Sequence, residues 1–108
     1  MNIEILAVGS ELLSPFYLDT NSLYLTQRLN DLGFAVSRKT VVGDARDDIR
    51  SSIQSALDRA AYLFVTGGLG PTSDDVTREG CAEALGRTIV FHHGVLDKIE
   101  ARFKRRGR

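Results

Sequence analysis

Apolar residues occur along the 108-residue chain in two kinds of segment, which alternate. In the first kind they are nearly continuous, as in strands that are buried on both faces. These segments predict four strands, over residues 3–8, 34–42, 62–66 and 88–91. In the second kind they recur three or four positions apart, which is the spacing of a helix with one buried face. These segments predict four helices, over residues 20–32, 46–59, 75–85 and 95–106.

Residues that favour helix ends stand beside two of the predicted helices. Thr20 is the expected N-cap of the first helix and Asp74 that of the third, because short polar side chains there accept hydrogen bonds from free amides. Gly33 and Gly86 follow the last turns of the same helices, where a left-handed residue commonly ends a helix. The buried stripe of the second helix is predicted to consist of Ile49, Ile53, Leu57 and Ala60.

The alternation of strands and helices predicts an α/β fold in which helices pack on a mostly parallel sheet. Right-handed crossovers place the carboxyl ends of such strands at one edge. Three loops with glycines and acids therefore meet there, at 9–11, 43–44 and 66–75. Ligands of open α/β sheets bind outside these carboxyl ends, so the sequence predicts a site at this edge.

Composition and charge restrict the classes of ligand and the cellular compartment that we expect for this protein. The formal net charge is zero, which gives no overall case for nucleic acid. Residues 97–108 carry six basic and two acidic side chains, and we interpret them as a solvated helix face. No apolar run approaches the roughly 20 residues of a membrane span, and the N-terminus lacks the basic start of a signal peptide. Cys81 is the only cysteine, which excludes an internal disulfide. We therefore predict a cytoplasmic protein that binds neither nucleic acid nor membrane.

The stretch 66–77 carries the strongest signal, with the sequence Thr-Gly-Gly-Leu-Gly-Pro-Thr-Ser-Asp-Asp-Val-Thr. It lacks the Gly-Lys-Ser/Thr of a Walker A loop, and it follows the third strand, unlike a dinucleotide fingerprint. Glycine amides before a helix suit a phosphate, and a divalent cation would reconcile that phosphate with the two aspartates. We assign capping to Asp74 and function to Asp75, with Asp44 and Glu11 as further candidates. A tight turn without a ligand is the alternative.

These residues resemble a known family. The glycine loop is similar to the signature of the molybdopterin-binding domain of MoaB, MogA and gephyrin-like proteins. Four segments in order resemble the N-terminal domain of the CinA (competence/damage-inducible) family more fully: Ala7-Val8-Gly9-Ser10-Glu11-Leu12-Leu13, Asp19-Thr20-Asn21, Val42-Gly43-Asp44 and the glycine loop. The similarity continues through Leu85-Gly86-Arg87 to Arg105-Arg106-Gly107-Arg108, so it covers essentially the whole chain.

The resemblance implies a three-layer α/β/α domain that forms homo-oligomers. It implies that the glycine loop holds a phosphate and that the family's two site aspartates correspond to Asp44 and Asp75. The first domain of the family extends beyond the Arg-Arg-Gly-Arg stretch, so residues 1–108 are expected to be one domain that is incomplete at its C-terminal end. The nicotinamide-nucleotide deamidase domain that many CinA proteins add has no counterpart in this sequence.

Two functions follow from the resemblance. The first is a metal-dependent ADP-ribose pyrophosphatase, in which Asp44 and Asp75 hold Mg²⁺ or a similar ion. In it the phosphate contacts Gly67, Gly68, Gly70 and Thr72, while Ser10, Glu11 and Asn21 line the far side of the pocket. The second is a molybdopterin-binding module that does not hydrolyse its ligand. An assembly domain without catalysis is a third reading.

Overall fold

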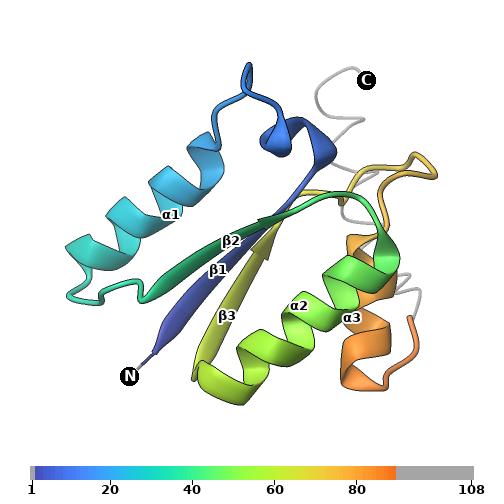
Figure 1. Ribbon diagram of the computed structural model, residues 1–108. Coiled ribbons are helices and arrows are strands. Elements are labelled where there is room, and N and C mark those ends of the chain that lie inside the picture. The colour runs from blue at the N-terminus through green and yellow to red at the C-terminus, as the bar shows by residue number, and fades with distance from the viewer. Residues whose placement is uncertain (1, 90–108) are drawn as a thin grey trace, which may run out of the picture.

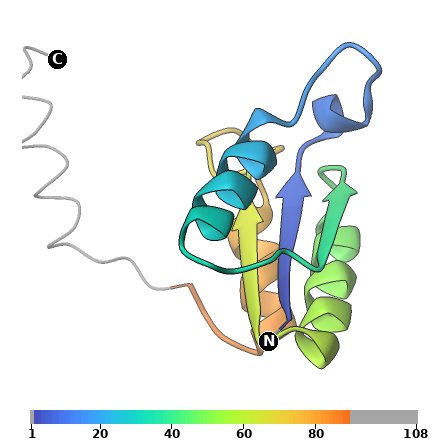
Figure 2. The same ribbon diagram turned by 90° about the vertical axis from the view of Figure 1, so that its left-hand side faces the viewer.

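The computed structural model describes residues 2–89, which form a parallel sheet with helices on both faces (Figure 1). The strands are β1 (Ile3–Val8), β2 (Arg38–Val42) and β3 (Tyr62–Thr66). The helices are α1 (Thr20–Asp31), α2 (Arg46–Arg59) and α3 (Thr77–Leu85), and a short 3-10 helix, η1 (Ser10–Leu13), follows β1. Helix α1 covers one face of the sheet, and α2 and α3 cover the other (Figure 2). The predicted three-layer α/β/α fold is confirmed.

The sheet has the strand order β2-β1-β3, and both strand pairs are parallel. All residues of the central strand β1 are buried, which explains its nearly continuous apolar sequence. Side chains alternate between the two faces. Leu6 and Val8 point toward α2 and pack against Ile49 and Ile53, which form the centre of the core.

Close packing between α2 and α3 depends on a glycine. A methyl group at Gly80 would lie 2.6 Å from the Cγ2 atom of Ile49, so α3 approaches α2 more closely than any other residue at position 80 would allow. The stripe of α2 that faces this core ends in Ala56, which is buried. The prediction for Leu57 was wrong, because its side chain lies outside this stripe and is 44% exposed.

The α1 face of the sheet is packed more loosely. An apolar groove of about 200 Å³ lies between α1 and β3, lined by Ile3, Leu29, Phe34, Tyr62 and Phe64. Within residues 2–89, no helix is long and apolar enough to span a bilayer.

Strand β2 is shorter than predicted, because it begins at Arg38 instead of residue 34. Its partner β1 begins at Ile3, and the amide and hydroxyl of Ser37 already donate to the Ile3 carbonyl at 2.8 and 2.9 Å. Residues 34–36 therefore have no β1 residue to pair with, and Phe34 lines the apolar groove instead.

Two helix starts also differ from the prediction. Asp19, and not Thr20, is the N-cap of α1, and its carboxylate accepts a hydrogen bond from the Ser22 amide at 3.0 Å. Helix α3 begins at Thr77, so Asp74 does not cap it. The predicted fourth strand has no regular structure at 88–89, and its remainder and the predicted helix over 95–106 lie outside the described residues.

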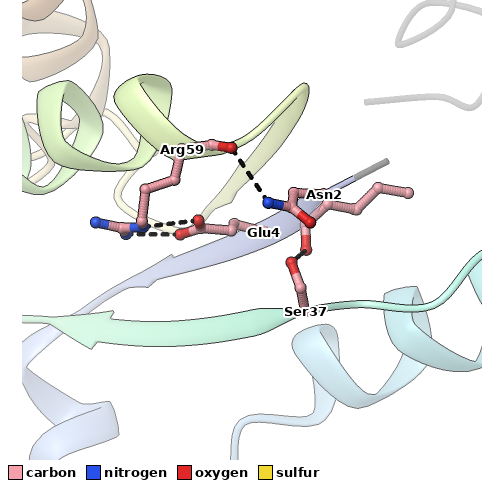
Figure 3. Close-up of polar contacts among 5 residues, drawn as sticks. Asn2, Glu4, Ser37 and Arg59 are labelled. Carbon is pink, nitrogen blue, oxygen red and sulfur yellow. Dashed lines mark hydrogen bonds and ion pairs between the residues drawn. The ribbon is translucent and has the colours of Figure 1, made fainter.

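An ion pair with a buried carboxylate lies at the amino end of the sheet. The Nε and Nη2 atoms of Arg59 donate to the two carboxylate oxygens of Glu4 at 2.9 and 2.8 Å (Figure 3). The Glu4 side chain is only 4% exposed, whereas that of Arg59 is 37% exposed. The Arg59 guanidinium, through its hydrogen bonds, holds the pKa of the Glu4 carboxyl below its ordinary value of 4.5.

Candidate functional site

The loops that follow β1 and β2 are joined by side-chain hydrogen bonds at the carboxyl edge of the sheet. The Ser10 hydroxyl donates to Oδ2 of Asp44 at 2.9 Å, and the Ser10 amide donates to Oδ1 at 3.3 Å. The Asp44 amide in turn donates to the Ser10 hydroxyl at 3.3 Å. This ring of contacts fixes the Asp44 carboxylate beside the first turn of η1, as the convergence of the two loops predicted.

The glycine loop is fixed by the start of α3. Gly67 and Gly68 have φ angles of 84° and 62°, which side chains disfavour, and a Cβ atom at Gly67 would overlap the Val8 carbonyl. The Thr77 hydroxyl donates to the Gly67 carbonyl at 2.7 Å, and the Thr77 amide donates to the Gly68 carbonyl at 3.3 Å. Because Thr77 is itself buried, the loop has a rigid support.

Asp75 turns back on its own loop. Its Oδ2 atom accepts hydrogen bonds from the Thr72 hydroxyl at 2.5 Å and the Thr72 amide at 3.2 Å, and its amide donates to the Thr72 carbonyl at 3.0 Å. The Thr72 hydroxyl bond is the main reason that the pKa of Asp75 lies below its ordinary value of 3.8, and Thr72 and Gly70 amides add to it. Asp75 is therefore a carboxylate at neutral pH. This local turn also explains why α3 begins two residues later than predicted.

Glu11 and Asn21 share a small pocket with Gly67, between η1 and the N-terminus of α1. The pocket holds about 60 Å³. It is lined by Val8, Glu11, Leu12, Tyr17, Leu18, Asp19, Thr20, Asn21, Thr66 and Gly67. The Glu11 carboxylate folds over Gly9, where a Cβ atom would lie only 2.5 Å from its Oε1. Of the three residues predicted for the far side of the site, Glu11 and Asn21 line this pocket and Ser10 does not.

The two predicted metal ligands belong to separate hydrogen-bonded pairs, Ser10 with Asp44 and Thr72 with Asp75. Among residues 2–89, no group of three or more His, Cys, Asp or Glu side chains is close enough to hold an ion. Mg²⁺, however, is usually held by one or two carboxylates together with water and substrate phosphates. The residues therefore fit an ion that arrives with a phosphate, and they do not fit one held by protein ligands alone.

Several residues of the site were not predicted. Thr77 supports the glycine loop, Tyr17 and Asp19 line the pocket, and the Arg78 guanidinium helps to lower the pKa of Asp75. Of these residues, only Thr77 has a role that the sequence could have indicated, because a hydroxyl at the end of a glycine-rich loop commonly forms a hydrogen bond with nearby backbone.

Comparison with known protein families identifies the family of this chain. A profile described as "Probable molybdopterin binding domain" matches residues 4–107. The chain belongs to this family. Among curated proteins it is 50% identical over 103 residues to a CinA-like protein of Solibacter usitatus, and the match covers 95% of the chain. Its similarity to such proteins places it among the CinA-like members.

Solved structures agree with this assignment. The CinA protein of Thermoplasma acidophilum superposes with a TM-score of 0.86 at 32% identity, over 95% of this chain and 61% of that one. The molybdopterin biosynthesis enzyme MoaB of Thermus thermophilus superposes with a TM-score of 0.73 at 26% identity, over 82% of this chain and 57% of that one. The chain spans about a quarter of the length of the curated relatives, since it covers 25% of the Solibacter protein.

Proposed function

We propose that this CinA-like domain hydrolyses a nucleoside diphosphate sugar, ADP-ribose, at its pyrophosphate with the help of a divalent cation. The observations that carry the proposal lie in the loops at the carboxyl edge of the sheet: a rigid glycine loop, and two separately fixed carboxylates, Asp44 and Asp75. Amides at 67–70 suit a phosphate, and the carboxylates suit the cation that such a phosphate brings. Glu11 and Asn21 line the adjacent pocket, where the sugar hydroxyls of the same ligand would find partners.

The role of each site residue in this proposal follows from its contacts. The hydroxyl and the amide of Thr72 both donate to Asp75, so Thr72 positions that carboxylate. The phosphate would then meet the amides of the preceding glycines that Asp75 does not use. Asp75 is a carboxylate at neutral pH, so its role in the proposal is to orient water or the cation. Ser10 keeps Asp44 in place in the same way. When bound, the cation would offset charge on the phosphoryl oxygens and lower the pKa of the attacking water.

A second function is supported by the family. Its profile is described as a probable molybdopterin-binding domain, and MoaB is a molybdopterin biosynthesis enzyme. Molybdopterin also carries a phosphate, which the same loop would hold without any hydrolysis. In this case Asp44 and Asp75 would contribute to ligand binding only.

The two functions are separated by turnover of ADP-ribose in the presence of Mg²⁺, measured as release of AMP and ribose 5-phosphate from the intact protein. Asp75→Asn and Asp44→Asn should each reduce the rate by about a hundredfold or more, the effect of removing a group that acts on transition-state charge. Asp58→Asn is the matched control, because Asp58 lies near the other end of α2 from the site.

Unchanged turnover in both site variants would show that the carboxylates are not used. An absence of turnover together with a copurified fluorescent pterin would favour the second function. A protein that binds neither nucleotide nor pterin would favour a role in assembly.

A further inference from the structure

A polar groove lies between α2 and the edge strand β2, away from the candidate functional site. It holds about 240 Å³ and is lined by Arg38, Thr40, Ser51, Ser52, Ser55 and Arg59. Arg38 is the first residue of β2 and Arg59 is the last of α2, so the groove reaches the amino ends of the strands. It shares no lining residue with the pocket beside the glycine loop.

One of the two arginines in the groove is held rigidly. The Arg59 guanidinium grips the buried carboxylate of Glu4 through two of its N–H groups, and the Asn2 side chain donates to the Arg59 carbonyl at 3.4 Å (Figure 3). A guanidinium has five N–H donors, so three remain for another acceptor. The ion pair therefore orients Arg59 at the wall of the groove without using all of its donors.

The second arginine adds positive charge that the described residues do not neutralise. Arg38 is the register partner of Glu4, so both side chains lie on the α2 face of the sheet. Its charge helps to lower the pKa of Glu4, but within residues 2–89 it forms no ion pair. Glu4 is already engaged by Arg59, and no acidic side chain lines the groove.

Hydroxyl groups complete the lining. The Ser51 hydroxyl donates to the Asp48 carbonyl at 3.3 Å, whereas Ser52, Ser55 and Thr40 form no side-chain hydrogen bond within the described part of the chain. Apolar side chains would normally fill the space between a helix and the sheet beneath it. Beneath the centre of α2 they do so, but at the solvent-facing edge beside β2 the lining consists of small hydroxyls and two guanidinium groups, which are donors that bind tetrahedral oxyanions.

We propose that this groove binds a phosphate group, held by the guanidinium groups of Arg38 and Arg59 and by the hydroxyls of Ser52 and Ser55. Because the groove shares no lining residue with the glycine loop or the pocket beside it, this site is independent of the proposed hydrolysis. Its ligand is inorganic phosphate or a phosphate ester small enough for the groove.

The test is a titration of the ¹⁵N-labelled chain with inorganic phosphate at constant ionic strength, followed by amide chemical shifts. Saturable shifts are expected at residues 38–40, 51–55 and 59. Arg38→Gln should weaken this binding by about tenfold or more, which is the loss of a charge-assisted hydrogen bond. Ser55→Ala should weaken it by about threefold and, because alanine favours helix, should fold at least as well.

Lys39→Gln is the matched control, because it removes the same charge from the neighbouring position on the opposite face of β2. Binding should be unchanged in this variant. Equal weakening in Arg38→Gln and Lys39→Gln would overturn the proposal in favour of general charge attraction. Shifts confined to residues 67–75 would overturn it in favour of the glycine loop, and an equal response to acetate would overturn the assignment to phosphate.

Discussion

Replacing Arg59 by glutamine should destabilise the chain more than replacing Glu4 by glutamine, although both changes break the same ion pair. Without Arg59, a carboxylate that is 4% exposed remains in the sheet without its partner. Breaking a fully buried pair in this way costs about 3–5 kcal/mol. Because Arg59 is 37% exposed and Arg38 lies nearby, we expect a cost at or below the lower end of that range. Without the Glu4 charge, a guanidinium that is 37% exposed regains water, so we expect a smaller cost.

The two variants should also differ in their pH dependence, because the stability difference between them should narrow on acidification. In the native chain the pKa of Glu4 is lowered, so the pair contributes fully above pH 4.5 and loses its contribution as the pH falls through the lowered value. In Arg59→Gln the main remaining influence is burial, which raises the pKa of Glu4. Protonation on acidification then relieves the buried charge, so Arg59→Gln should gain stability relative to Glu4→Gln between pH 7 and pH 4.

Urea unfolding followed by circular dichroism, with equal m-values as a condition, measures these differences. Arg50→Gln is a suitable control, because the Arg50–Asp47 pair on the same helix is exposed and long at 3.7 Å, and its loss should cost less than about 0.5 kcal/mol. An equal or larger cost for Glu4→Gln at pH 7 would refute the reasoning. So would a difference between the two variants that does not change on acidification.

Three further substitutions test the site and its supports. Thr72→Val should raise the pKa of Asp75 toward 3.8, as read from the carboxyl ¹³C shift, and an unchanged pKa would contradict the main role given to the hydroxyl. Asp19→Ala should cost about 1 kcal/mol in urea unfolding because α1 loses its N-cap, whereas no loss would show that the cap bond is not formed. Gly67→Ala should cost more than about 2 kcal/mol, since a Cβ atom at φ 84° meets the Val8 carbonyl, and a smaller cost would mean that the loop adapts easily.

Local pattern was sufficient where an element depends mainly on its own residues. The bounds of β1, α2 and β3 match the prediction. The spacing of apolar residues indicates directly whether a segment is buried on two faces, as a strand, or along one stripe, as a helix. The start of β2 could not be predicted in this way. It depends on where β1 begins, which determines the first residue that can pair with it.

In the site, too, some features could be predicted from the sequence and others depend on long-range contacts. Topology predicted that the loops carrying Ser10 and Asp44 meet, but it could not predict that one hydroxyl would hold the carboxylate across 34 positions of sequence. The function assigned to Asp75 stays a prediction, whereas capping by Asp74 was wrong because Val76 precedes the first helical residue. The ion pair of Glu4 could not be predicted from local pattern, because its partner Arg59 lies 55 positions away.

The absence of a side chain at Gly80 should also affect the candidate site at the carboxyl edge of the sheet. Gly80 sets the distance between α3 and α2, and Thr77, one helical turn earlier, sets the position of the Gly67 carbonyl. Any larger residue at position 80 would move a rigid helix and the loop attached to it together. Ligand affinity in this domain should therefore depend on the distance between α2 and α3 at Gly80, although Gly80 has no functional group and does not belong to the candidate site.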